Sequence, residues 1–269
     1  EKMTMIVTHA GGSPAVSRHV LRMTCLVWTA VSLMLLLVEG VEAEETNTEC
    51  DVGPDAMSFV DATQTCITVE GQKRCWYTLQ PGTPADEPVP LVLDLHGFGS
   101  CPQLSSLYTG WAQKATQSNE FVLVWPMGTT DPDVTVSPCW DAGNCCCWHK
   151  SAQAAEVDDV SVLMQMITGT VSASAVPIDT KRIYLAGHSN GCMMAQKMAA
   201  EASSVVAAVC CHSGVFMERQ YPAGADYQPV PILTVFGDED KVVNYQGQAV
   251  TDYGAPQPGA VANTVSWAA

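Results

Sequence analysis

Short apolar runs separated by helical segments are the feature that most constrains the fold of this chain. The runs are rich in Val, Leu and Ile and lack the strict alternation of a strand with one face in water. Such runs are typical of strands that are buried on both faces, as in a parallel sheet covered by helices. They span residues 89–95, 121–125, 182–186, 205–210 and 230–236.

Two segments between these runs have the pattern of helices. Apolar residues recur with helical spacing over 155–167, and residues 190–200 are rich in Met and Ala, which we expect to pack in the core. A hairpin with its turn at Gly71-Gln72 is predicted over 65–79. Alternating strands and helices predict an α/β fold with a mostly parallel sheet flanked by helices, in a single domain over 65–269.

The N-terminal residues have the pattern of an export signal. Arg18 and Arg22 precede an apolar run over 25–38, and a small-residue ending at Ala43 follows. The run is shorter than the roughly 20 residues of a membrane-spanning helix. We therefore predict that residues 1–43 comprise upstream residues and a signal peptide, and that the signal peptide starts at Met23. Residues 44–64 would be a lead-in segment before the domain. The protein is then secreted and extracellular without a stable membrane anchor, and an uncleaved anchor is the alternative.

The cysteines also indicate an exported protein, and the net charge excludes one class of partner. The chain has 12 cysteines, and all but Cys25 follow Ala43. In an exported protein the 11 cysteines after Ala43 predict disulfides. Because 11 is an odd number, one of them is free or has its partner elsewhere. The adjacent Cys145-Cys146-Cys147 lack the two-residue gap of zinc sites. A net charge of −16 argues against nucleic acid as a partner.

A strand-turn-helix segment carries the sharpest chemical signal. Gly187-His188-Ser189-Asn190-Gly191 follows the run 182–186 and opens the second predicted helix. A G-x-S-x-G sequence in this context holds its serine in a strained turn, so the flanking positions must be very small. This predicts Ser189 as a nucleophile at the edge of the sheet. An ordinary turn with an exposed serine is the alternative.

Two loops at the same edge could complete such a site. Gly97-Phe98-Gly99 follows the run 89–95, and we predict that the N–H groups of Phe98 and Asn190 form an oxyanion hole. A glycine turn without a chemical role is the alternative. Asp238, Glu239 and Asp240 follow the last run, and spacing alone leaves open which of them would orient a histidine.

With these motifs the chain resembles the polyhydroxybutyrate depolymerase and feruloyl esterase family of secreted α/β-hydrolases. The matching stretches are 90–97, 140–146, 157–160, 182–191 and 237–245, in the order of that family. The resemblance implies the α/β-hydrolase fold and a serine esterase mechanism that needs no metal or organic cofactor. It also implies Asp240 as the acid.

The chain departs from that family at the histidine. The fold places its histidine after the acid, but the six histidines are His9, His19, His96, His149, His188 and His212. We expect His96 and His188 to be structural, and His149 or His212 could replace the base. The simpler expectation is a chain that is incomplete at its C-terminus, which would be nearly inactive as it stands.

The resemblance predicts a carboxylic-ester hydrolase. Its substrate would be a polyester or a polysaccharide that carries feruloyl or acetyl esters, and hence polymeric. One alternative is a non-catalytic protein of the same fold that binds such a polymer through Trp140 and Trp148. A serine peptidase is the other, since fold alone does not decide the substrate.

Overall fold

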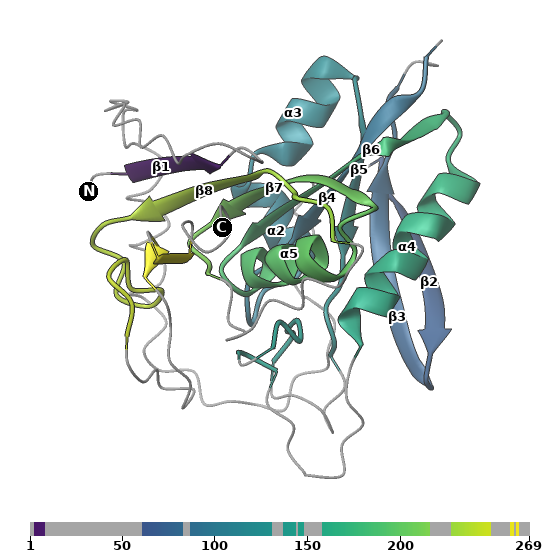
Figure 1. Ribbon diagram of the computed structural model, residues 1–269. Coiled ribbons are helices and arrows are strands. Elements are labelled where there is room, and N and C mark those ends of the chain that lie inside the picture. The colour runs from purple at the N-terminus through teal and green to yellow at the C-terminus, as the bar shows by residue number, and fades with distance from the viewer. Residues whose placement is uncertain are drawn as a thin grey trace.

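A computed structural model describes residues 3–8, 61–82, 87–130, 137–143, 145–147, 158–215, 227–248, 259–260 and 262–263. Within these residues an eight-stranded sheet has the strand order β1-β8-β7-β6-β4-β5-β3-β2 (Figure 1). Helices lie on both of its faces. The predicted α/β architecture is therefore confirmed.

The centre of the sheet is parallel. β4 pairs with β5 and β6, and β7 pairs with β6 and β8, all in parallel. Leu91, Leu93, Val122 and Leu185 in these strands are almost completely buried, as the unbroken apolar runs predicted. The strands are β4 (Val89–Leu95), β5 (Val122–Pro126), β6 (Ile178–His188), β7 (Val206–His212) and β8 (Ile232–Gly237).

Antiparallel strands form both edges of the sheet. β2 (Thr63–Val69) and β3 (Gln72–Leu79) form the predicted hairpin, but its turn is Glu70-Gly71, one residue earlier than expected. Both turn residues have positive φ, 51° and 82°, which suits the twist of a tight hairpin. At the other edge β1 (Met3–Thr8) pairs with β8. β1 lies in the predicted upstream residues, whereas the predicted signal peptide lies outside the described residues.

The helices cover the two faces with separate cores. α4 (Asp159–Ala173) and α5 (Asn190–Glu201) cover the face with Leu91 and Leu93 and lie in front in Figure 1. On the opposite face Ala112 and Ala115 of α3 (Trp111–Ser118) pack with Trp125. α3 and the short α2 (Pro102–Tyr108) were not predicted, because neither is long enough to give a clear helical period.

The start of α4 and the methionines of α5 can be compared with the two predicted helices. The side chain of Asp158 accepts the Ser161 N–H at 2.9 Å and caps α4, which begins later than predicted; residues 155–157 lie outside the described residues. Met194 and Met198 of α5 are fully buried, so the expected core role of its methionines is confirmed. No helix in the described part of the chain is long and apolar enough to cross a membrane.

Disulfides bind most of the described cysteines, as the cysteine content predicted. The bridges are Cys66–Cys75, Cys139–Cys147, Cys145–Cys146 and Cys192–Cys211. Cys101 is also disulfide-bonded, and Cys210 is the free thiol among the described cysteines. The sulfurs of the adjacent Cys145, Cys146 and Cys147 are thus used in bridges.

Candidate active site

Ser189 occupies a strained turn between β6 and α5. Its φ of 51° and ψ of −119° are rare for a residue with a side chain. The turn is held because the Ser189 N–H donates to the His212 carbonyl at 2.9 Å and the Ser189 carbonyl accepts the Met193 N–H at 3.0 Å. The serine is only partly buried. The sequence correctly predicted both the strain and the position of this residue.

The two glycines of the motif are required by close backbone contacts. A Cβ atom on Gly187 would lie 2.4 Å from the Gly191 carbonyl, and one on Gly191 would lie 2.1 Å from the Leu95 carbonyl oxygen. Real Cβ atoms essentially never approach this closely. The start of α5 therefore packs directly on the end of β4, which places the serine beside the loop that follows β4.

That loop carries Phe98, one of the two predicted oxyanion donors, whereas the other, Asn190, is the first residue of α5. A Cβ on Gly97 would lie 3.6 Å from Ser189 Cβ, so the loop backbone runs past the serine side chain. Gly99 has a φ of +68°, and the Ser100 N–H closes the turn on the Gly97 carbonyl at 3.1 Å. Phe98, at the tip of this turn, is 36% exposed. Phe98 and Asn190 thus lie on segments that flank Ser189, and their donor roles remain predictions.

His96 is a structural residue, as expected. It is fully buried; its Nδ1 lies 2.8 Å from the Gly97 carbonyl, and its Nε2 lies 3.0 Å from the Gly128 amide. Because Nε2 accepts from an N–H group, the proton of the neutral ring sits on Nδ1 and is donated to Gly97. Burial, the larger cause, and the positive charge of Arg74 help lower its pKa to about 4. The ring is therefore a neutral brace for the loop.

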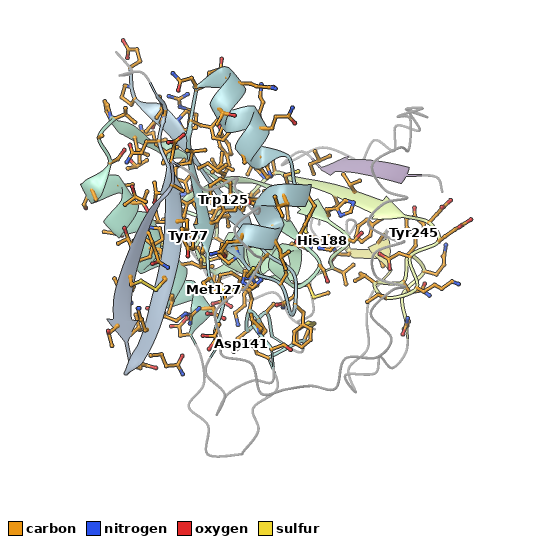
Figure 2. The ribbon with its side chains drawn as sticks, turned by 180° about the vertical axis from the view of Figure 1, so that it is seen from behind. Tyr77, Trp125, Met127, Asp141, His188 and Tyr245 are labelled. Atoms are coloured by element: carbon orange, nitrogen blue, oxygen red, sulfur yellow. A yellow bond between two sulfur atoms is a disulfide. The ribbon has the colours of Figure 1, made fainter. Side chains whose placement is uncertain are left out.

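His188 and His212 lie beside the serine, and the Asp240 carboxylate is near enough to His188 to affect its charge. The rings of His188 and His212 stack with centroids 5.3 Å apart, and Tyr108 meets His188 edge-on at 5.8 Å. Burial and the neighbouring His212 lower the pKa of His188 to about 4. The Asp240 carboxylate has the opposite, smaller effect and raises this pKa. Figure 2 shows Trp125, His188 and Tyr245 in this order across the sheet.

Asp240 differs from its two acidic neighbours. It is half-buried, and one carboxylate oxygen accepts the Val242 and Val243 N–H groups at 2.9 Å each. Asp238 and Glu239 are exposed. The fixed carboxylate and its electrostatic effect on His188 support the choice of Asp240, which remains a prediction.

Asp94 is a buried acid that the sequence analysis did not single out. It lies at the end of β4, two residues before His96, and is 1% exposed. One carboxylate oxygen accepts from Ser105, Thr109 and Trp125, and the other has no hydrogen-bond partner. Burial raises the pKa of Asp94 to about 6, although these three hydrogen bonds lower it.

Asp94→Asn is expected to change how stability depends on pH. The pKa of Asp94 is 3.8 in the unfolded state and about 6 in the folded state. An acid with a pKa raised by folding therefore destabilises the folded state as the pH rises through this range. The stability of the variant relative to wild type should therefore increase by up to about 3 kcal/mol between pH 4 and 6 and stay level above. Urea unfolding at several pH values measures this difference.

Asp179→Asn is the matched control for this pH effect. Its hydrogen bond from Arg182, the largest cause, lowers the pKa of Asp179, so its contribution has the opposite sign. The stability of Asp179→Asn relative to wild type should therefore not increase with pH. A flat Asp94→Asn difference from pH 4 to 8 would contradict the raised pKa.

Comparison with known proteins places this chain in a family. Residues 82–253 match the model of the phospholipase/carboxylesterase family, which is more than half of the chain. The chain belongs to the phospholipase/carboxylesterase family. The α/β-hydrolase fold that the resemblance implied is thereby confirmed.

Two curated relatives are named as an acetylxylan esterase and a feruloyl esterase. A bifunctional acetylxylan esterase/xylanase of Neocallimastix patriciarum is 31% identical over 157 residues, which are 58% of this chain and 20% of that protein. Feruloyl esterase B of Piromyces equi is 28% identical over 170 residues, which are 62% of this chain and 29% of that protein. The chain therefore spans a fifth to under a third of the length of these two relatives.

A solved structure also matches part of the chain. An acetyl xylan esterase from Aspergillus awamori matches with a TM-score of 0.44 and 21% identity, over 62% of this chain and 56% of that chain. The feruloyl esterase part of the predicted resemblance is thus confirmed by the relatives. The polyhydroxybutyrate depolymerase part stays a prediction.

Proposed function

We propose that this carboxylesterase-family chain is a serine hydrolase of acetyl or feruloyl esters carried by a polysaccharide. The observation that carries the proposal is the geometry of Ser189, which stands in a strained turn at the start of α5 with the Gly97 backbone beside its side chain. The names of the two curated relatives support the substrate class.

The proposed reaction is acyl transfer through a covalent intermediate. A base takes the Ser189 hydroxyl proton while Oγ forms a bond to the ester carbonyl carbon. The N–H groups of Phe98 and Asn190 stabilise the negative oxygen of the tetrahedral intermediate. The carbon–oxygen bond to the alcohol then breaks, and the alcohol leaves with the proton. Water attacks the acyl-enzyme in the same way and releases the acid and Ser189.

Asp240 has the proposed role of orienting the base and stabilising its charged form. The resemblance implies a histidine after Asp240, and none occurs in residues 241–269. His212 is the alternative base among the described residues, since its main chain contacts Ser189 and its ring stacks on His188. His149 lies outside the described residues. The assays use the protein expressed from its complete gene.

The burial of Trp140 weakens the binding-protein alternative. Its side chain is fully buried, so it presents no aromatic face to a polymer, and Trp148 lies outside the described residues.

Secretion is part of the proposal, and the disulfides among the described cysteines support an oxidising compartment. The formal net charge of −16 argues against a nucleic acid as the bound polymer.

A substrate panel tests the proposal. We expect release of acetate from acetylated xylan or of ferulate from methyl ferulate, at rates at least about 10-fold above those for poly(3-hydroxybutyrate) or a peptide p-nitroanilide. Chromatography of the released acids measures this. Faster cleavage of the polyester or the anilide would contradict the proposed substrate class, and binding of xylan without release of any acid would favour the non-catalytic alternative.

A further inference from the structure

The loop 139–147, described except for residue 144, holds the two halves of the candidate site together. We propose that Trp140 is a positioning residue, which fixes the oxyanion loop relative to the serine turn. This inference rests on the proposed function, because positioning matters only if Ser189 reacts. Trp140 is hydrogen-bonded to Asn190 and His96, and it acts through these two residues.

The first contact joins Trp140 to the serine turn. The Asn190 side chain accepts the Trp140 N–H at 2.8 Å and donates to the Trp140 carbonyl at 3.0 Å. Asn190 is fully buried, so neither bond competes with water. A side-chain amide that pairs with both main-chain groups of one residue fixes the direction as well as the distance between the two segments.

The second contact joins Trp140 to the oxyanion loop. The indole N–H of Trp140 donates to the His96 carbonyl at 2.9 Å, and its ring lies 5.1 Å from the His96 ring. His96 in turn donates to the Gly97 carbonyl, which also accepts the Ser100 N–H. The position of the Phe98 turn therefore depends on the His96 peptide, and Trp140 holds that peptide from outside the loop.

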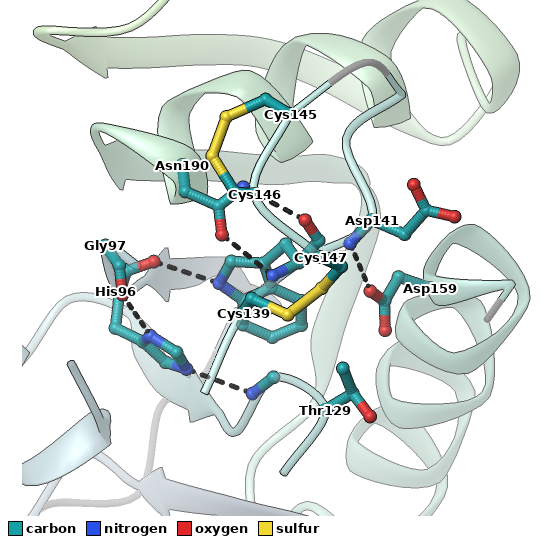
Figure 3. The surroundings of a disulfide bond; sticks show 12 residues. His96, Gly97, Thr129, Cys139, Asp141, Cys145, Cys146, Cys147, Asp159 and Asn190 are labelled. Atoms are coloured by element: carbon teal, nitrogen blue, oxygen red, sulfur yellow. Dashed lines mark hydrogen bonds between the residues drawn. A yellow bond between two sulfur atoms is a disulfide. The ribbon is translucent and has the colours of Figure 1, made fainter. Parts of the chain in front are cut away.

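Other parts of the protein anchor the loop of Trp140. Asp159 accepts the Asp141 N–H at 2.7 Å and pairs with the buried Arg74 of β3. Cys139 exchanges two main-chain hydrogen bonds with Thr129 and forms a disulfide with Cys147. Figure 3 shows the Cys139–Cys147 disulfide and the hydrogen bond from Asp141 to Asp159, with Asn190 and His96 on one side and Asp159 on the other. The indole is thus presented from a rigid frame.

The consequence for catalysis is geometric. Oxyanion donors must lie about 2.7–3.1 Å from the oxygen that becomes negative, and a displacement of about 1 Å removes most of their effect. Without the indole N–H, the buried His96 carbonyl loses its partner and the loop can shift. Substrate contacts outside the oxyanion loop would be unaffected. Loss of the bond should therefore lower kcat and leave KM nearly unchanged.

The experiment compares two buried indoles in the protein expressed from its complete gene. Trp140→Phe is expected to lower kcat for p-nitrophenyl acetate about 10- to 100-fold, with KM changed by less than about threefold. Inhibition by phenylboronic acid, whose tetrahedral adduct on serine occupies the oxyanion hole, should weaken by a similar factor. The control is Trp125→Phe, which removes an indole bond of 3.1 Å to Asp94 on the opposite face of the sheet. It should keep kcat within about threefold.

A second variant covers the case that Trp140→Phe does not fold. Benzothienylalanine at position 140 replaces the indole N–H by sulfur and keeps the volume of the ring, and it should show the same loss of kcat and of boronate affinity. Wild-type kcat and boronate affinity in this variant overturn the positioning role. Equal losses in the Trp125 control also overturn it, because they would reflect general destabilisation. If wild type and Ser189→Ala hydrolyse the ester equally, the proposed function itself fails, and the inference with it.

Discussion

Ser189→Ala is expected to lower kcat/KM for p-nitrophenyl acetate by about 10⁴-fold or more, because the covalent route is lost when the hydroxyl is removed. The residual rate would come from substrate binding and the oxyanion donors alone. Stability should change little, since the side chain is only partly buried and makes no side-chain cap bond to α5. Initial rates in the protein expressed from its complete gene, together with thermal unfolding, measure both effects.

Two carboxylates supply matched variants for the same assay. Asp240→Asn should lower kcat/KM by roughly 10²- to 10⁴-fold, because a neutral amide cannot stabilise a positively charged base. Its amide oxygen can still accept the Val242 and Val243 N–H groups, so the loop should keep its shape. Asp238→Asn, at an exposed position two residues earlier, should stay within about twofold of wild type.

Some results would contradict these assignments directly. Ser189→Ala with wild-type turnover would mean that another group is the nucleophile. Equal losses in Asp240→Asn and Asp238→Asn would mean that the acidic loop acts only through its charge. A larger loss in Asp238→Asn than in Asp240→Asn would transfer the proposed role to Asp238.

Gly191→Ala is expected to cause the largest loss of stability, about 4 kcal/mol or more. The new Cβ would lie 2.1 Å from the Leu95 carbonyl oxygen and 2.5 Å from that of His96. Both atoms belong to the backbone at the end of the mostly buried β4, so they cannot turn away as a side chain could. The start of α5 would have to move off β4, which would also separate Ser189 from the oxyanion loop.

Urea unfolding and ester hydrolysis of the same samples check this expectation. The control is Gly82→Ala, where a Cβ would meet its nearest neighbour, Asn119 Oδ1, at 3.8 Å. That distance is an ordinary contact, and the change should stay within about 1 kcal/mol of wild type. A Gly191→Ala protein as stable and active as Gly82→Ala would refute the close packing of α5 on β4.

The sequence alone predicted the parts of this protein that depend on local patterns. Unbroken apolar runs indicated strands buried on both faces, and the parallel pairs β4 to β8 have that environment. The glycines of the serine motif indicated a turn with no room for side chains, and the Cβ contacts at Gly187 and Gly191 agree. Such signals are readable because strand burial and turn strain act on residues that are adjacent in the chain.

Only the tertiary structure decided which distant residues meet. It distinguishes the half-buried Asp240 from two exposed acids, sets the tautomer of His96 through Gly128, and buries Trp140 between Asn190 and His96. It also pairs the cysteines and gives Asp94 its raised pKa. These properties depend on desolvation and on hydrogen bonds between segments tens of residues apart, and neither leaves a spacing in the sequence from which it could be predicted.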